Sequence, residues 1–366
     1  YKSGTSVLVY SPILKPGAFI MSLITDIKVE IPDYNHMSQV MVYVTSESGH
    51  VGVGEAWWGI PSADNPGSTS IPIANVIEHL LAPRLIGKSS RTIEKHWFDL
   101  WDYGYRYADE GIFLMGLSGI DIALWDLLGK ELDTSVCQLL GGPVHEKIPG
   151  YASLPALRDP EVVLSEVKRA MDAGFFAVKL HELDPIHVHN IRREFGNDLH
   201  IMVDVNGHFN KIEAIEVGKE LAKGNVTWYE EPVRPMRDHA AIKEVGDRAN
   251  VPIAAGENEY TLKNFEQFLQ SKALTYLQPE ITKIGGITAA KRITGLTESY
   301  NTALSPHNMR IGPALSASIQ WGFNSPMTAW QEVPWVRYEF AAQYNLPPVE
   351  DGYVLPPTEP GIGLIK

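Results

Sequence analysis

The sequence has 366 residues, which is long for a single core of about 100 to 200 residues and indicates two domains or one large α/β barrel with an appendage. Hydrophobic residues make up 44% and charged residues 20%, which is typical of a packed globular protein and excludes disordered, collagen-like and coiled-coil chains. The net charge of −13, without a local basic patch, argues against nucleic-acid and membrane partners. The single cysteine, Cys137, suits a reducing compartment, so we expect a cytoplasmic protein.

The first part of the chain is predicted to be an α+β domain. Residues 1–20 lack the layout of a signal peptide, and Met21 is a candidate natural start with those residues as an extension. From residue 22 the pattern changes from strand alternation to helical spacing, which is typical of an antiparallel sheet followed by helices. We place this domain at 22–145, with strands at 24–31, 39–45 and 52–56 and helices at 72–82, 91–103 and 112–130.

From residue 146 short apolar runs alternate with amphipathic stretches of helix length, which is the pattern of repeated strand–helix units. Eight runs are present, and eight strands close a parallel barrel. We therefore predict an α/β fold in which a modified (β/α)8 TIM-type barrel over 146–333 carries the N-terminal α+β capping domain. Residues 334–366 lack helical period and are expected to return to the capping domain. The expected strands are Ile148–Ser153, Ala177–His181, His200–Asn206, Thr227–Glu231, Ile253–Glu257, Thr275–Glu280, Thr302–His307 and Met327–Glu332.

Acidic residues end the third, fourth and fifth of these runs, at Asp204, at Glu230 with Glu231, and at Glu257. The ends of barrel strands meet at one mouth, where adjacent carboxylates repel one another unless a cation neutralises them. Oxygen ligands without paired cysteine or histidine favour Mg²⁺ over zinc. Each of these acids, taken alone, could instead cap the following helix. For Glu231 the alternative role is a structural hydrogen bond.

The motifs together resemble the enolase superfamily, specifically its mandelate racemase-like branch, the mandelate racemase/muconate lactonizing enzyme family with its acid sugar dehydratases. The resemblance covers nearly everything from about residue 22. It implies one Mg²⁺ per subunit on Asp204, Glu230 and Glu257. The matching segments are "GLSGIDIALWDLLGK", "QLLGG", "AVKLH", "DVNG", "YEEP", "GEN", "PEITKIGG", "SPHN" and "WQE".

Two residues of the second run, Lys179 and His181, are expected to face the pocket together because side chains alternate along a strand. The family usually has a second lysine as the base that removes the proton α to a carboxylate, and in this chain His181 stands at that position. Histidine, with an ordinary pKa of about 6.5, serves as a base near neutrality without a large shift. The alternative is that His181 only hydrogen-bonds substrate while Lys179 assists or acts as the base.

The opposite face of the substrate is assigned to Glu280 and His307 on the sixth and seventh runs. A carboxylate that receives one ring N–H fixes the tautomer and raises the basicity of the other nitrogen. The family has aspartate at the position of Glu280, and the alternative is a structural histidine. Glu332 matches the family's eighth-strand glutamate, which donates to a substrate carboxylate oxygen and is then at least partly protonated; its alternative is a helix cap.

Further residues are predicted to bind substrate. Asn206 and Lys283 are expected to border the metal site, with a more remote ion pair as the alternative for Lys283. Tyr34, His36 and Trp57 belong to first-domain loops. In the family such loops close the barrel mouth and select the substrate, and ordinary aromatic packing between the domains is the alternative.

These residues predict Mg²⁺-dependent abstraction of the proton α to a carboxylate through a metal-stabilised enediolate, with dehydration of an acid sugar as the first choice. Racemisation, epimerisation or cycloisomerisation of a hydroxy acid or sugar acid is the nearest alternative, because bases on both faces also permit the proton to return. A catalytically inactive metal-bound binding protein is the third, motivated by His181 and Glu280. The expected partner is a small-molecule carboxylate substrate, and we expect a homo-oligomer.

Overall fold

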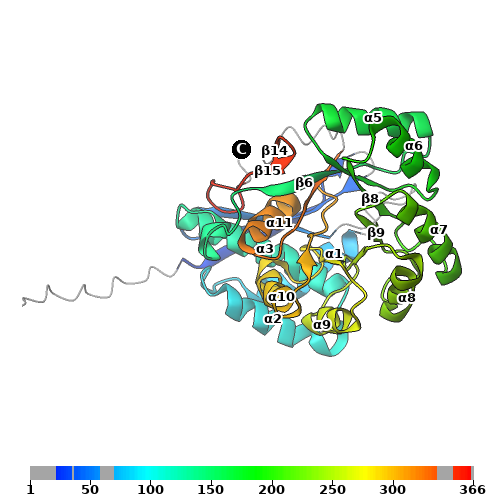
Figure 1. Ribbon diagram of the computed structural model, residues 1–366. Coiled ribbons are helices and arrows are strands. Elements are labelled where there is room, and N and C mark those ends of the chain that lie inside the picture. Colours follow the sequence, from blue (N-terminus) through cyan, green and yellow to red (C-terminus); the bar gives the residue numbers. More distant parts are fainter. Residues whose placement is uncertain (1–21, 35–36, 58–69, 336–348, 364–366) are drawn as a thin grey trace, which may run out of the picture.

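The computed structural model describes residues 22–34, 37–57, 70–335 and 349–363. Its first part is a three-stranded antiparallel sheet of order β1–β4–β5, backed by helices (Figure 1). The predicted helix over 72–82 is divided into an α-helix, a π-helical turn and a 3₁₀ turn, since Pro83 has no N–H to continue the ladder. The elements are β1 (Ile24–Glu30), β2 (Asp33–Tyr34), β3 (Met37–Ser38), β4 (Val40–Ser46), β5 (Val51–Ala56), α1 (Ile71–Val76), η1 (Ile77–Leu81), η2 (Ala82–Arg84), α2 (Ile93–Ala108), α3 (Ile112–Glu131) and α4 (Val136–Leu139).

Helix α3 is the centre of this domain, and almost its whole length is buried. One side packs against β5 and another against α10 of the barrel, which explains why it is apolar all round. The approach to β5 requires glycine, because a Cβ on Gly52 would lie 2.0 Å from the carbonyl oxygen of Ala123. By length and composition α3 is apolar enough to cross a bilayer, but 83% of that stretch is buried inside the protein, as in a core helix.

The second part is a parallel barrel, as predicted. Strands β6 to β12 pair in sequence order, and β13 pairs with β6. A parallel bridge between Leu304 and Thr328 joins β12 to the segment before β13, so the eight strands form a closed ring. The elements are β6 (Ile148–Ser153), α5 (Pro160–Asp172), β7 (Ala177–Leu180), α6 (Ile186–Phe195), β8 (His200–Asp204), α7 (Lys211–Lys223), β9 (Trp228–Glu230), α8 (His239–Ala249), β10 (Ile253–Ala255), α9 (Leu262–Ser271), β11 (Tyr276–Leu277), α10 (Gly286–Tyr300), β12 (Ala303–Leu304), α11 (Pro313–Asn324) and β13 (Gln331–Pro334).

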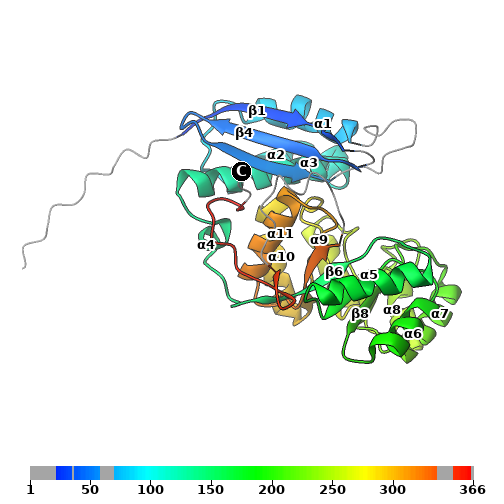
Figure 2. The same ribbon diagram turned by 90° about the horizontal axis from the view of Figure 1, so that it is seen from above.

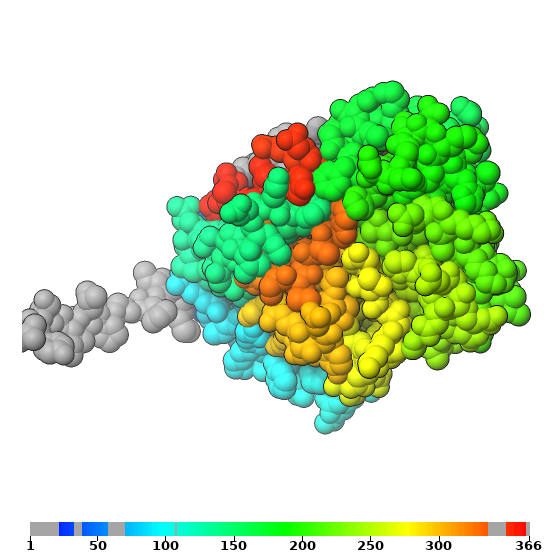
Figure 3. Space-filling model, in the orientation of Figure 1, coloured from blue at the N-terminus to red at the C-terminus, as the bar shows by residue number. Residues whose placement is uncertain are grey.

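The C-terminal residues run back to the first domain. The hairpin of β14 (Val349–Glu350) and β15 (Tyr353–Val354) pairs antiparallel with β6. Further along, the Ile362 N–H donates to Asp126 on α3 at 2.8 Å. Figure 3 shows this segment, in red, packed against the green and teal residues of β6 and the preceding chain. The domain limits at 145 and 333 stay predictions.

The capping domain covers one side of the barrel (Figure 2). Helix α3 lies between the antiparallel sheet and the barrel helices α10 and α11, while α5 to α8 lie away from the cap. The end of β5 reaches the barrel, because Trp57 just beyond it contacts Lys283 and His307. The cap therefore closes over the carboxyl ends of the strands, where barrel active sites are built.

Candidate active site

Three buried carboxylates meet where β8, β9 and β10 end. Asp204 and Glu230 are the last residues of β8 and β9, and Glu257 follows β10 by two residues. One ligand oxygen from each lies within 4.8 Å of the others, and all three side chains are buried. No other group of three acids, histidines or cysteines with this spacing is found in the part of the chain that the structure describes.

The carboxylates are oriented by neutral donors. Glu230 Oε2 accepts from Trp228 Nε1 at 2.7 Å and from Gln278 Nε2 at 2.8 Å, and Asp204 accepts from the backbone and side-chain nitrogens of Asn206 at 2.8 and 3.0 Å. Burial raises the pKa of Glu230 to about 7 against the attraction of Lys179, because adjacent buried anions are costly. Three anionic oxygen donors held this close fit a hard cation such as Mg²⁺.

Lys179, at the core of the site, connects these acids to Glu332. Its Nζ lies 2.8 Å from Glu332 Oε1, 3.0 Å from Glu230 Oε1 and 3.7 Å from Asp204 Oδ2. Burial by itself lowers the pKa of a lysine, but the carboxylates of Glu230 and Glu332 raise the pKa of Lys179 well above its ordinary value. Lys179 is therefore an ammonium in this arrangement, which suits charge stabilisation better than proton abstraction.

His181 lies beside the same acids with a defined tautomer. Its Nδ1 is 2.5 Å from the carbonyl oxygen of Leu154, and a carbonyl can only accept, so Nδ1 carries the proton. The other ring nitrogen, Nε2, lies 3.3 Å from Asp204 Oδ2. Burial by itself lowers the pKa of His181, but the hydrogen bond to the Asp204 carboxylate raises it above its ordinary value. Once the ring is neutral, Nε2 is the basic nitrogen. The geometry is compatible with His181 as a base and with the alternative of a hydrogen-bonding residue.

The structure brings Glu280 and His307 together. His307 Nδ1 donates to Glu280 Oε2 at 2.7 Å, and Nε2 lies 2.7 Å from Glu257 Oε2. Thr282 holds the other carboxylate oxygen of Glu280 through its backbone N–H at 2.9 Å and its hydroxyl at 2.7 Å. Burial would lower the pKa of His307, but the carboxylates of Glu257 and Glu280 raise it well above its ordinary value. Glutamate, which is longer than the family's aspartate, thus still pairs with the histidine. Glu280 and His307 are called the dyad below.

Glu332 is held by a contact at each oxygen of its carboxylate. Its Oε1 lies 2.8 Å from Lys179 Nζ, and its Oε2 accepts from the Asn308 N–H at 2.9 Å. Burial would raise the pKa of Glu332, but Lys179 and His307 lower it below the ordinary value. These contacts favour the carboxylate form of Glu332, and its role as a donor to a substrate carboxylate stays a prediction. Sequence alone did not reveal that Lys179 forms ion pairs with both Glu332 and Glu230.

The substrate-binding candidates are only partly placed. Trp57 lies beside the dyad, with its ring centroid 6.3 Å from that of His307, and the ammonium of Lys283 lies 3.8 Å from the Trp57 ring centroid. Asn206 contacts Asp204 of the acidic triad, and its φ of 45° is a left-handed conformation that asparagine tolerates. The side chain of Tyr34 and all of His36 lie outside the described residues.

Asn258 is a residue of the site that the sequence analysis missed. Its Nδ2 donates to Glu231 Oε1 at 2.8 Å and to Glu257 Oε1 at 3.1 Å, and its Oδ1 accepts from Lys283 Nζ at 3.0 Å. Glu231 thus makes the structural hydrogen bond that was its alternative role. The "GEN" motif contained a signal for Asn258, since this asparagine directly follows Glu257 of the acidic triad. The strand pattern, however, does not predict the direction in which the asparagine side chain points.

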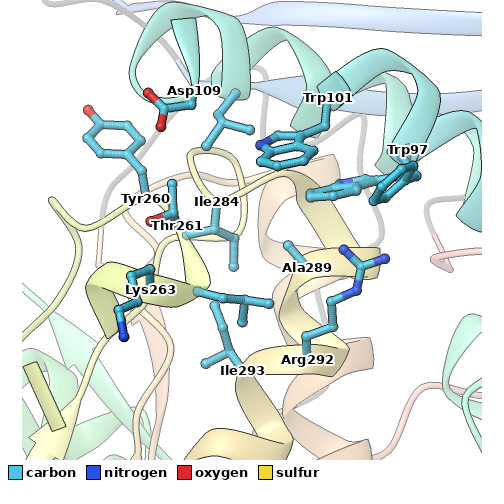
Figure 4. A pocket seen from close by; sticks show the side chains of 13 residues that line it. Trp97, Trp101, Asp109, Tyr260, Thr261, Lys263, Ile284, Ala289, Arg292 and Ile293 are labelled. Carbon is cyan, nitrogen blue, oxygen red and sulfur yellow. The ribbon is translucent and has the colours of Figure 1, made fainter. Parts of the chain in front are cut away.

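A separate cavity of about 550 Å³ lies between α2 and the barrel helices α9 and α10. Figure 4 shows Trp97 and Trp101 side by side on one wall, with Ile284, Ala289 and Ile293 opposite. None of the metal-site or dyad residues lines this cavity, so the chemistry belongs at the barrel mouth. Its described lining residues are Trp97, Phe98, Trp101, Asp109, Leu114, Tyr260, Thr261, Leu262, Lys263, Ile284, Ala289, Arg292 and Ile293.

Comparison with known proteins agrees with this geometry. Residues 21–141 match the mandelate racemase/muconate lactonizing enzyme N-terminal domain, and residues 162–365 match the enolase C-terminal domain-like family. A D-galactonate dehydratase of Cronobacter sakazakii is 30% identical over 348 residues, which cover 88% of this chain and 87% of that protein.

Solved structures give the same result. The 3,6-anhydro-D-galactonate cycloisomerase from Zobellia galactanivorans superposes with a TM-score of 0.84 at 28% identity, covering 94% of this chain and 97% of that chain. A racemase from Streptomyces coelicolor with bound magnesium shares the fold, with a TM-score of 0.83 at 24% identity and coverage of 94% and 97%.

A capped barrel with an acidic triad and two histidines beside it is the arrangement found here, and the matching domain models show an enzyme of the enolase superfamily. Within it, the chain belongs to the mandelate racemase/muconate lactonizing enzyme family and is a dehydratase-like enzyme. The predicted fold class is confirmed.

Proposed function

We propose that this enzyme is a Mg²⁺-dependent dehydratase of acid sugars that begins by removing the proton α to the substrate carboxylate. The observation that carries the proposal is a pair of histidines whose Nε2 atoms lie beside different acids of the triad. His181 Nε2 lies beside Asp204, and His307 Nε2 lies beside Glu257. Each ring is held through Nδ1, so both present the same nitrogen to the space between them.

The donor set of Asp204, Glu230 and Glu257 would hold the Mg²⁺, which when bound supplies positive charge that makes the α-proton of a coordinated carboxylate more acidic. In this reaction His181 accepts the α-proton at Nε2. His307 then donates a proton from Nε2 to the departing β-hydroxyl group, and Glu280 stabilises the charged imidazole. The fixed positive charge of Lys179 stabilises the negative charge that develops on the substrate.

The curated D-galactonate dehydratases support a hydroxylated acid as the substrate class. A second candidate is proton return without water loss, as in an epimerase or cycloisomerase, and it is favoured by the 3,6-anhydro-D-galactonate cycloisomerase structure. The similarity to D-galactonate dehydratases and to a cycloisomerase supports an enzyme over the inactive binding protein. The small-molecule carboxylate partner, the homo-oligomeric state and the cytoplasmic location are proposals from sequence.

The test is a proton NMR time course in deuterated water with a panel of acid sugars and Mg²⁺. Dehydration gives a 2-keto-3-deoxy product, whereas α-proton exchange without water loss indicates racemisation or epimerisation. The variants are His181→Asn and His307→Asn, with His50→Asn on an exposed turn of the cap as the matched control. Absence of both exchange and product across the panel, in a folded protein that binds Mg²⁺, would refute the proposal.

A further inference from the structure

The two barrel helices that face the cap begin without a side-chain cap of their own. Helix α10 starts after Gly285 and α11 after Gly312, and neither residue has a side chain to accept from the first turn. The unpaired N–H groups of a helix start need acceptors, and the helix dipole favours a carboxylate there. This leaves both starts dependent on groups from outside the barrel.

The capping domain supplies one buried carboxylate to each start. Asp121 on α3 accepts from the Thr288 N–H at 2.9 Å, in the first turn of α10. Glu55 near the end of β5 accepts from the Ala314 N–H at 3.1 Å, in the first turn of α11. Both carboxylates are 1% exposed. The cap thus makes a similar carboxylate contact at the start of each of these two helices.

The contact at α11 differs because the chain before this helix carries His307. Ala314 lies seven positions after His307, and Asn308 fixes the first part of this segment through its N–H to Glu332 Oε2 at 2.9 Å. The Asn308 side chain donates to the Arg310 carbonyl at 2.7 Å. Glu55 fixes the far end. The segment 307–314 is therefore held by the barrel at one end and by the cap at the other.

Gln39, the residue directly before β4, adds a second contact from the cap. Its Nε2 lies 3.0 Å from Glu55 Oε1 and 3.0 Å from the carbonyl oxygen of Ile311. Gln39 is completely buried, and its partners Glu55 and Ile311 are buried as well. The amide therefore orients the Glu55 carboxylate and restrains the middle of the segment at the same time.

We propose that Glu55, oriented by Gln39, is a positioning residue for the acid/base His307, acting through segment 307–314. This inference rests on the proposed function for its kinetic consequence. Proton transfer needs the imidazole nitrogen within about 3 Å of the reacting atom. A displacement of about 1 Å costs roughly 100-fold in rate. Docking of the cap thus holds the proton carrier in place as well as closing the mouth.

The primary variant is Glu55→Gln, and Asp121→Asn is its matched control at α10. Glutamine keeps the size of the side chain, but its NH₂ group must face either Gln39 Nε2 or the Ala314 N–H, both of which are donors. We expect Glu55→Gln to lower kcat roughly 10- to 100-fold with little change in KM. Asp121→Asn, which has the same chemistry at the other helix, should leave kcat within about twofold of wild type.

Two measurements do not depend on turnover. Backbone amide hydrogen exchange should speed up in segment 308–316 in Glu55→Gln, whereas Asp121→Asn should affect only the start of α10. Titration with Mg²⁺ should give unchanged affinity in both variants, since the acids of the triad come from β8, β9 and β10. A uniform structural weakening of the cap would not produce this separation.

Gln39→Met covers the case in which Glu55→Gln fails to fold, because it removes both donor contacts with little change in size. It should give the same pattern of lower kcat and faster exchange in 308–316. Wild-type kcat and exchange in the folded variant would overturn the inference, as would equal losses of kcat in Asp121→Asn. If the wild-type enzyme turns over no acid sugar, the proposed function fails, and the exchange data alone then decide whether the cap holds the segment.

Discussion

Replacing Asp121 with asparagine is predicted to change how the stability of the protein depends on pH. Burial between α3 and α10 raises the pKa of Asp121 from 3.8 to about 7, even though Thr288 donates two hydrogen bonds, from its N–H at 2.9 Å and its hydroxyl at 2.6 Å. The unfolded chain releases this proton at lower pH than the folded protein does. The folded state therefore loses stability as the pH rises from about 4 to about 7.

The size of the effect follows from the shift. A difference of about three pKa units, at about 1.36 kcal/mol per unit, gives a total of about 4 kcal/mol. Between pH 5 and pH 8 the loss is about 2.5 kcal/mol, because part of it occurs below pH 5. Asparagine resembles the neutral acid, with its carbonyl accepting from Thr288 N–H and its amide donating to the Thr288 hydroxyl. It does not titrate in this range.

The assay is urea unfolding of wild type and Asp121→Asn at pH 5, 6, 7 and 8. The free energy of unfolding of the variant relative to wild type should increase by about 2.5 kcal/mol over this range. Asp99→Asn on the exposed face of α2 controls for the substitution and should stay within about 0.5 kcal/mol of wild type. A difference between Asp121→Asn and wild type that is constant with pH would refute the reasoning, because it would mean that the two Thr288 bonds outweigh burial.

Three further predictions concern activity. Glu257→Gln should weaken Mg²⁺ binding, measured by titration calorimetry, and abolish turnover, because one of three anionic donors is lost; full activity at limiting metal would remove Glu257 from the donor set. His307→Asn should eliminate product formation in the NMR assay while the protein still binds Mg²⁺, and a wild-type rate would exclude His307 as a proton carrier. Thr282→Val removes the hydroxyl donor to Glu280 and should lower kcat roughly tenfold at unchanged KM, whereas an unaffected kcat would show that the backbone N–H alone orients the carboxylate.

Much of the fold and of the metal triad was predictable from sequence. Strand periodicity is local, and the rule that parallel barrel strands end at one mouth converts positions along the chain into proximity in space. Asp204, Glu230 and Glu257 therefore meet as the spacing predicts. The pairing of Glu280 with His307 follows from the same rule, because the sixth and seventh strands are neighbours.

The protonation states and the contacts between cap and barrel were decided only by the tertiary structure. Lys179 on β7 contacts Glu332 on β13, the two strands that flank β6, and this contact lowers the pKa of Glu332. No periodicity encodes a contact between strands that are far apart in sequence. Gln39 and Ile311 are 272 positions apart. Their contact depends on how the cap docks, and docking is fixed by side-chain packing such as that of α3 on α10 and of β5 on α11. Sequence patterns determine which face of an element is buried, whereas side-chain distances across an interface exist only once both surfaces have packed.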